Sequence, residues 1–261
     1  MAVFPQLATG ATAQFRFEKQ VDGRAILNRA MDASTYAAAD PAGRRVKWGL
    51  EFVGLTESEF GALEGLFEAC EGRLGAFTFL DPAANLLGWT EDLGAAAWDK
   101  DALLSVAAGS AGPAGEGFLL TNAAPGWGEL WQTVEGPANF SYSFAVWVRG
   151  SGMVRLRRFA GAESAELEFA LTASWRRVEL NGALAGSGVS VSFAIGVPSG
   201  GMVEAAGPQV DAQLVAGEYR KSLGRGGVFQ AARFAQDTLE ARVEAPDWID
   251  ARVTIESRFE D

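Results

Sequence analysis

The stretch from Cys70 to Trp98 marks a change in the character of the sequence. Before it, apolar residues recur at the spacing of a helix with a single apolar stripe, namely Phe60, Leu63, Phe67 and Cys70. Gly72 is placed to end that helix. After Asn85 the helical period disappears, and short alternating runs separated by Gly, Ser, Pro and Asn replace it. The chain is therefore expected to leave one domain and begin another here.

The part before this change predicts a β-rich unit crossed by one helix. Alternating apolar residues predict strands over residues 13–17, 46–52 and 74–80. Thr56 and Glu59 form the pattern of a capping box, which predicts the start of the helix. Residues 32–43 are small and polar, so a loop is expected there, with its turn at Asp40-Pro41.

The part after the change predicts an all-β sandwich. Its expected strands cover residues 117–121, 129–134, 141–149, 154–159, 165–171, 176–180, 189–197 and 203–214. In the strand over 189–197, one face is apolar and the other carries Ser190, Ser192, Ala194 and Gly196. That second face is expected to be open, either as the floor of a groove or as a plain outer surface.

The end of the chain predicts two further strands, over residues 239–243 and 249–255, joined at Pro246-Asp247. A hairpin with one apolar face is not stable alone in water, so it needs the sheet begun by the first part of the chain. We therefore expect a mainly β protein with one discontinuous domain, residues 1–84 plus 224–261, and an inserted domain, residues 85–223. The two ends of the insertion are expected to lie close together, with residues 74–80 in the same sheet as the closing strands.

Composition excludes several classes of function. The net charge of −11 and the pI near 4.6 argue against a nucleic-acid partner. Arg155, Arg157 and Arg158 form the densest basic group and are expected to be a solvated strand face. With no histidine and one cysteine, the chain has no disulfide, no Ser-His-Asp or Cys-His arrangement and no zinc cluster of the usual kind. Cys70 is expected to be a buried hydrophobic residue.

No run approaches 18 consecutive apolar residues, and the N-terminal sequence lacks the pattern of a cleaved signal. Neither membrane insertion nor secretion through a signal peptide is therefore expected.

The first and last parts of the sequence resemble phage distal tail or tail-tip proteins. The segments that carry the resemblance are FPQLATGATAQF, MDASTYAAADP, VKWGLEFVGLT, EGRLGAFTFLDP and, at the end, FAQDTLEARVEAPDWIDARVTIESRFE. MDAS stands where a glycine would be expected in the loop. The resemblance implies a structural protein of the virion tail tip, assembled in the host cytoplasm. It would form a hexameric ring joining the tail tube to the hub, baseplate or tip, with exposed sheet edges and residues 32–43 as candidate interfaces.

The middle of the sequence resembles a jelly-roll carbohydrate-binding module of the kind found in phage tail fibres. The segments that carry this second resemblance are NLLGWTEDLGAAAW, FSYSFAVWVRG, TASWRRVELNG and GPQVDAQLVAGEYRKS. It implies that the insert is an attachment module that binds a polysaccharide of the host surface.

Three tryptophans of the insert are candidates for stacking on sugar rings. Trp147 is the first candidate, because the alternation over 141–149 places it opposite the apolar face. Trp127 and Trp131 follow, one in a glycine-rich loop and the other near the start of a strand. The alternative is that they pack within the protein.

Asp211 and Asp92 are candidate ligands for a structural calcium ion, although no calcium-loop spacing is present. No other cofactor is expected. Acidic residues are abundant, but no pair stands out as catalytic, so we expect a protein that is not an enzyme. Two alternatives remain open at this stage: a tail-associated depolymerase, and an insert that is purely structural.

Overall fold

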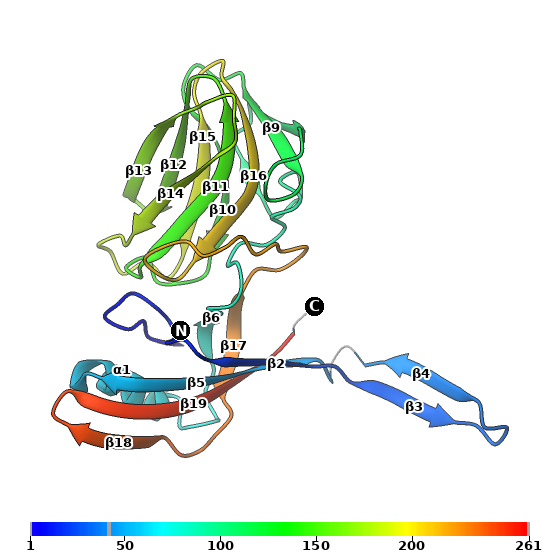
Figure 1. Cartoon of the computed structure of the whole chain (residues 1–261), viewed down its shortest axis with the longest axis vertical. Coiled ribbons are helices and arrows are strands. Elements are labelled where there is room, and N and C mark those ends of the chain that lie inside the picture. The colour runs from blue at the N-terminus through cyan, green and yellow to red at the C-terminus, as the bar shows by residue number, and fades with distance from the viewer. Residues whose placement is uncertain (1, 41–42, 260–261) are drawn as a thin grey trace. The chain divides into compact units, whose positions relative to one another are not determined.

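The computed structural model describes residues 2–40 and 43–259 and is mainly β (Figure 1). The chain divides into two compact units. The sheet unit comprises Met1–Leu7, Ala13–Phe79 and Phe229–Asp261, and the sandwich unit comprises Ala8–Thr12 and Leu80–Val228. The long insertion therefore comprises Leu80–Val228, whereas the sequence predicts an insertion of residues 85–223.

The sheet unit is built on one seven-stranded sheet. In spatial order its strands are β1 (Ala2–Val3), β6 (Phe77–Leu80), β17 (Val228–Phe234), β19 (Trp248–Arg258), β5 (Arg45–Leu55) and β2 (Glu18–Asp22), and β18 (Glu240–Ala245) also pairs with β19. The sheet therefore contains β6 together with the closing strands, as predicted. Its buried face carries Trp48, Phe79 and Phe229, and the Trp48 ring centroid lies 4.8 Å from that of Phe79 and 4.7 Å from that of Phe229.

One helix, α1 (Glu57–Ala69), packs on this sheet, and its start follows from the predicted capping box. Thr56 Oγ1 accepts a hydrogen bond from the Glu59 amide at 3.2 Å, while the Glu59 carboxylate accepts one from the Thr56 amide at 2.9 Å. Leu63 and Leu66 are buried, and Cys70 is buried just beyond the last turn, as expected.

Two expectations for the first part of the chain are wrong. Residues 13–17 do not form a strand; the Gln14 side-chain amide instead hydrogen-bonds both the N–H and the carbonyl of Val53. Residues 35–39 are not part of a loop, because β3 (Ala25–Arg29) and β4 (Thr35–Ala39) form a separate two-stranded ribbon. The turn expected at Asp40-Pro41 extends outside the described residues. All residues of both strands are exposed.

The sandwich unit contains two five-stranded antiparallel sheets that form a jelly-roll β-sandwich. The first sheet has the order β13 (Glu163–Ala170), β12 (Met153–Ala160), β15 (Val191–Val197), β10 (Gly128–Val134) and β7 (Asp99–Lys100). The second sheet has the order β14 (Arg176–Gly182), β11 (Tyr142–Gly150), β16 (Met202–Asp211), β9 (Gly117–Asn122) and β8 (Leu104–Ala108). The eight predicted strands of the insert are all present, and β7 and β8 are additional.

The core of the sandwich lies between its two sheets. Phe144 from the second sheet and Phe193 from the first are fully buried, with ring centroids 5.6 Å apart. The two ends of the insertion are hydrogen-bonded, since the Asp81 amide donates to the Gly227 carbonyl at 2.9 Å and the Gly227 amide donates to the Asn85 carbonyl at 2.8 Å. This closeness was predicted from the sequence.

Among the described residues, no helix is long and apolar enough to cross a membrane.

Candidate functional site

The outer face of the first sheet gathers charged and aromatic side chains around a strand of small residues. On β15 the outward residues are Ser192, Ala194 and Gly196. The strands on either side place Glu129 and Arg155 beside Gly196, Trp131 and Arg157 beside Ala194, and Thr133 and Phe159 beside Ser192. The register of the sheet alone therefore assembles this group, which we call the β15 face.

A carboxylate held by two arginines lies at the centre of the β15 face. One oxygen of Glu129 accepts a hydrogen bond from Arg155 at 2.8 Å, and the other accepts one from Arg157 at 3.0 Å. The Glu129 side chain is only 10% exposed and that of Arg155 14%. Such charge-assisted contacts are stronger than neutral hydrogen bonds, so the three side chains form a rigid layer.

This layer corrects one expectation. The outward small residues of β15 were expected to be open, but Ala194 is fully buried and Ser192 is 8% exposed. Arg155 and Arg157 start from β12 and reach Glu129 on β10, so they pass over the strand between them. The small side chains of β15 leave room for that crossing. The outer surface is formed by the partly exposed Arg157 and the two tryptophans described next, while Arg155 is mostly covered.

Trp127 and Trp131 both belong to the β15 face. The Arg155 guanidinium carbon lies 4.5 Å from the centroid of the Trp127 ring, which is a cation–π contact. A Cβ atom on Gly196 would lie 3.4 Å from that ring, so Trp127 packs directly over this glycine. Trp131 sits between Ala194 and Asp99 in the register of the sheet. Both tryptophans are half-buried and keep part of the indole accessible.

Trp147 lies elsewhere, on the second sheet. In the β11 register it is opposite Arg177 on one side and Ala206 on the other, and it is half-buried. As predicted, it projects away from the apolar core. The three candidate tryptophans therefore occupy the outer faces of two different sheets and do not form one site.

The outer face of the second sheet also contains an ion pair covered by an aromatic ring. Arg149 donates two hydrogen bonds to the Glu204 carboxylate, at 3.1 and 2.9 Å, and its guanidinium lies 4.8 Å from the Trp175 ring centroid. Burial raises the pKa of Glu204, but hydrogen bonds from Arg149 and from the Ser110 amide, together with the Arg149 charge, lower it below its usual value. With Trp175 over the pair, this face is occupied by the protein's own contacts.

The expectation that the three arginines form a solvated face is wrong for Arg158, and the Arg155 side chain is also mostly covered, at 14% exposure. Arg158 is 2% exposed and points to the inner side of the sandwich, where it donates to the Gly182 and Ala183 carbonyls. Burial lowers the pKa of this guanidinium. The alternation of a strand explains the split, because residues 155 and 157 share one face and residue 158 lies on the other.

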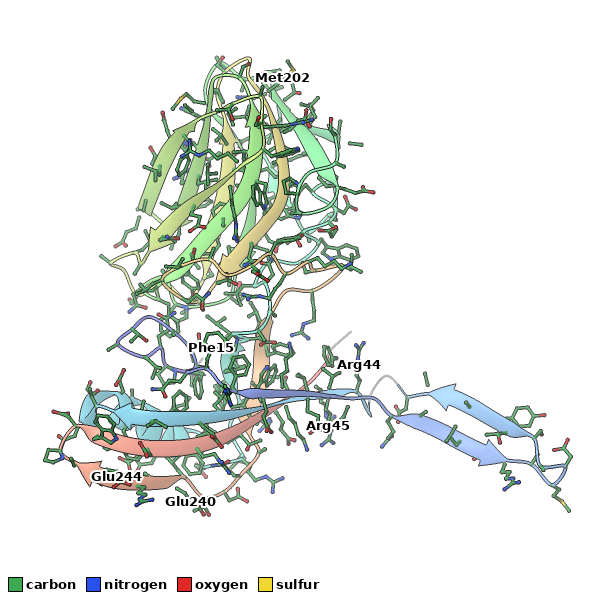
Figure 2. The ribbon with its side chains drawn as sticks, in the orientation of Figure 1. Phe15, Arg44, Arg45, Met202, Glu240 and Glu244 are labelled. Carbon is green, nitrogen blue, oxygen red and sulfur yellow. The ribbon has the colours of Figure 1, made fainter. Side chains whose placement is uncertain are left out.

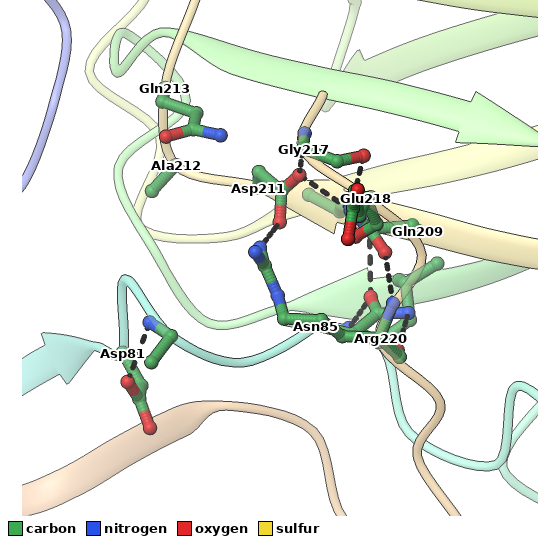
Figure 3. Close-up of polar contacts among 12 residues, drawn as sticks. Asp81, Asn85, Gln209, Asp211, Ala212, Gln213, Gly217, Glu218 and Arg220 are labelled. Carbon is green, nitrogen blue, oxygen red and sulfur yellow. Dashed lines mark hydrogen bonds and ion pairs between the residues drawn. The ribbon is translucent and has the colours of Figure 1, made fainter. Parts of the chain in front are cut away.

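The two candidate calcium ligands have different surroundings. Asp92 is exposed and accepts a hydrogen bond from the Gly94 amide. Asp211 is buried on β16, where its carboxylate accepts hydrogen bonds from Arg220, from the Gln209 side chain at 2.7 Å and from the Gly217 amide at 3.0 Å (Figure 3).

This donor set does not fit calcium. Both oxygens of Asp211 already accept from N–H groups, and the Arg220 guanidinium supplies the positive charge that an ion would bring. Over residues 2–40 and 43–259, no group of three or more His, Cys, Asp and Glu side chains is placed to hold a metal ion.

The same buried network fixes both ends of the insertion. The Asn85 side chain donates to the Pro208 carbonyl at 2.9 Å and to the Arg220 carbonyl at 3.2 Å, and it accepts from the Leu87 and Val210 amides (Figure 3). All four hydrogen-bonding positions of this amide are used. The chain entering the sandwich is therefore tied to β16 and to the segment that leaves it.

The β15 face has the chemistry that sugar recognition requires. Indole rings offer flat apolar surfaces, while guanidinium groups and a carboxylate offer donors and acceptors in fixed positions. Sequence reasoning selected Trp127 and Trp131 but missed Glu129, Arg155 and Arg157 as their neighbours. The available signal was the alternation of β10 and β12, which places Glu129, Trp131, Arg155 and Arg157 outward. The pairing of both strands with β15 is visible only in the structure.

No protein-family model matches the sequence, and no curated protein is significantly similar to it. Among solved structures, the chain is similar to the enzymatically active domain of tailspike protein 4 from bacteriophage CBA120. That pair has 13% identity and a TM-score of 0.40, and the alignment covers 51% of this chain but only 22% of the tailspike chain.

Two carbohydrate-binding modules are similar at the same level. One is TmCBM61 in complex with β-1,4-galactotriose, with 19% identity, a TM-score of 0.37 and coverage of 48% of this chain and 97% of that one. The other is a xylan-binding family 22 module from Paenibacillus barcinonensis, with 11% identity, a TM-score of 0.38 and coverage of 51% and 94%. Likeness this low leaves the function to be argued from the residues of this chain.

Proposed function

We propose that the sandwich unit binds a carbohydrate chain on the β15 face. Trp127 and Trp131 stack on sugar rings, and the Arg155–Glu129–Arg157 layer forms hydrogen bonds with hydroxyl groups. The observation that carries the proposal is that one sheet register brings two partly accessible indoles against a rigid layer of paired charges. The role is binding, without a catalytic step.

We further propose that the protein is a structural component of a phage tail tip. The sheet unit forms a ring, hexameric as the sequence resemblance implies, that joins the tail tube to the hub or baseplate. The sandwich unit then presents its glycan-binding face to the host surface. Support comes from the sequence resemblance and from the ribbon β3–β4, since a two-stranded ribbon with every residue exposed is marginally stable until a partner covers it.

Glycan binding is tested on the full chain with an array of bacterial surface polysaccharides and oligosaccharides. We expect Trp127→Ala and Trp131→Ala each to weaken binding of any glycan found by about tenfold or more, the loss typical of one stacking ring. Trp248→Ala is the matched control, because this tryptophan is 52% exposed but belongs to the sheet unit. Trp147→Ala tests the other sheet of the sandwich.

The outcomes separate the candidate roles. Loss of binding in the Trp127 and Trp131 variants, with Trp147→Ala and Trp248→Ala unaffected, supports the proposed face. Loss in Trp147→Ala alone would move the site to the second sheet. New reducing ends released from a bound polysaccharide would indicate a depolymerase, and no binding to any glycan would indicate a purely structural insert.

A further inference from the structure

Charge is distributed unevenly along the two long strands of the sheet unit. β5 and β19 run antiparallel, so that Arg45 is opposite Arg258 at one end and Leu55 is opposite Ile249 at the other. Positive side chains gather at the first end and negative side chains at the second. Figure 2 shows the separation, with Arg44 and Arg45 well apart from Glu240 and Glu244.

The basic end surrounds a depression of about 430 Å³. Three of its lining residues are Arg45, Arg233 and Arg258, and the single acidic one is Glu256. Within the part of the chain that the structure describes, neither Arg45 nor Arg258 forms an ion pair. On a protein with a net charge of −11, unpaired arginines around a depression are suited to an acidic partner surface.

The acidic end is formed by β18 and the turn that follows it. Glu240 and Glu244 lie on β18, all of whose residues are exposed, and Asp247 lies in the turn. Arg242 lies between the two glutamates and forms an ion pair with Glu244 at 2.5 Å, so the carboxylates of this end outnumber its one arginine. Asp250 follows on β19, and the amide of Glu57, at the start of α1, donates to the Asp247 carboxylate at 3.1 Å. β18 pairs with β19 only, so among the described strands its second edge has no partner.

We propose that the sheet unit associates head to tail with a second copy of this chain. The acidic β18 end of one copy docks against the arginines around the depression of the next. Because the two surfaces are different and lie at opposite ends of the same strands, the contact is heterologous and repeats from copy to copy, as a ring requires. The inference rests on the proposed ring-forming role and specifies its interface.

Charge complementarity is the reason for proposing a second copy of the chain as the partner of these two surfaces. Copies with a net charge of −11 repel one another, so self-association needs a place where opposite charges meet. The exposed arginines of the basic end and the exposed carboxylates of β18 supply such a place within one chain. A contact of this kind is screened by salt, because the Debye length falls from about 10 Å at 0.1 M to about 3 Å at 1 M ionic strength.

The test is sedimentation of the full chain at low salt and at high salt. We expect oligomers at low ionic strength and dissociation constants at least about tenfold weaker at high ionic strength. The double variants Arg45→Glu/Arg258→Glu and Glu240→Lys/Glu244→Lys should each lose association at low salt. The fourfold variant that carries all these changes reverses both ends at once and should regain association.

Arg176→Glu/Lys221→Glu is the matched control. It changes the net charge by the same amount as the arginine double variant, on exposed residues of the sandwich unit, and should associate like the natural chain. Circular dichroism confirms that each variant is folded. A variant without residues 260–261, two acidic positions after Phe259, should associate at least as well as the natural chain, and weaker association would contradict the inference.

The remaining outcomes are also decisive. Association that survives either double variant, or a folded fourfold variant that stays monomeric, would overturn this interface while leaving a ring possible. A monomer at every salt and protein concentration would remove both the interface and the ring. Glycan binding by the sandwich unit is measured separately and is independent of all these results.

Discussion

Glu129 controls the β15 face because two arginines depend on the same carboxylate. With 10% of its side chain exposed, it separates guanidinium groups that would otherwise repel one another at short range. It also holds Arg155 flat beneath Trp127, so that the stacking ring has a fixed support. Under the proposed function, glycan binding and local stability would therefore both depend on Glu129.

We predict that Glu129→Gln destabilises the sandwich by about 1–3 kcal/mol, since a neutral amide leaves Arg157 without its counter-charge and leaves Arg155 with only the more exposed Glu166. Urea unfolding followed by tryptophan fluorescence measures the change. Glu166→Gln is the control, because Glu166 is 48% exposed, lies 3.5 Å from Arg155 and should contribute less than about 0.5 kcal/mol. Equal effects in the two variants would contradict this role for Glu129.

At the residue scale, the sequence predicted correctly whether a side chain is buried or outward where the periodicity of its own helix or strand determines this. The outward placement of Trp147 and the burial of Cys70 followed from local periodicity. Sequence reasoning failed for Arg158, since a compositional view of three nearby arginines ignored the alternation that turns one of them inward. It also could not find the contact of Glu129 with Arg155, because the two residues meet across a strand that lies later in the sequence.

At the element scale, hydrogen bonds of the Asn85 side chain hold together the segments that enter and leave the inserted sandwich. One buried amide joins the entering chain to β16 and to the segment around Arg220, and it leaves none of its hydrogen-bonding positions unused. Replacing such a group leaves backbone donors and acceptors buried without partners.

We therefore predict that Asn85→Ala destabilises the sandwich by about 2–4 kcal/mol, the sum of more than one unsatisfied buried group. Thermal unfolding measures the loss. Asn181→Ala is a suitable comparison, because Asn181 is exposed and its side-chain oxygen accepts a hydrogen bond from the Ser143 hydroxyl; this substitution should cost about 1 kcal/mol or less. A small effect of Asn85→Ala would show that these side-chain hydrogen bonds are not needed for stability.

Elements with a strong local signal were predicted well, and elements that depend on remote partners were not. The capping box located α1, and alternation located the eight strands of the insert. The segment 32–43, which contains β4, was expected to be a loop because this alanine-rich strand has no clear alternation. β17 was missed, since its position is fixed by pairing with β19 and β6.

At the scale of the whole molecule, the structure combines two cores on one chain. The aromatic core of the sheet unit and the core of the sandwich are separate clusters of buried residues. Sequence reasoning anticipated this division from a change of period and from a closing hairpin that lacked a sheet. It had no means to anticipate the segment Ala8–Thr12, which groups with the sandwich through contacts such as the hydrogen bond from Thr12 to the Ala212 carbonyl.

We predict that the whole protein needs no divalent metal for stability. Treatment with EDTA, followed by thermal unfolding with and without added calcium, should change Tm by less than about 1 °C, because the Arg220 guanidinium already compensates the buried Asp211 carboxylate. A rise of several degrees on adding calcium would instead support the ion suggested by the resemblance to jelly-roll modules.

The hydrogen-bonded ends of the insertion also have a mechanical consequence. The long insertion, Leu80–Val228, is joined to the sheet unit through β6 and β17, which are neighbours within the seven-stranded sheet, and its two ends are hydrogen-bonded through Asp81 and Gly227. A pull on a sandwich held by a cell surface would load both strands at once, and β17 would pass its share to β19 through their ladder. The load would therefore enter the sheet through two neighbouring, hydrogen-bonded strands and not through a single strand.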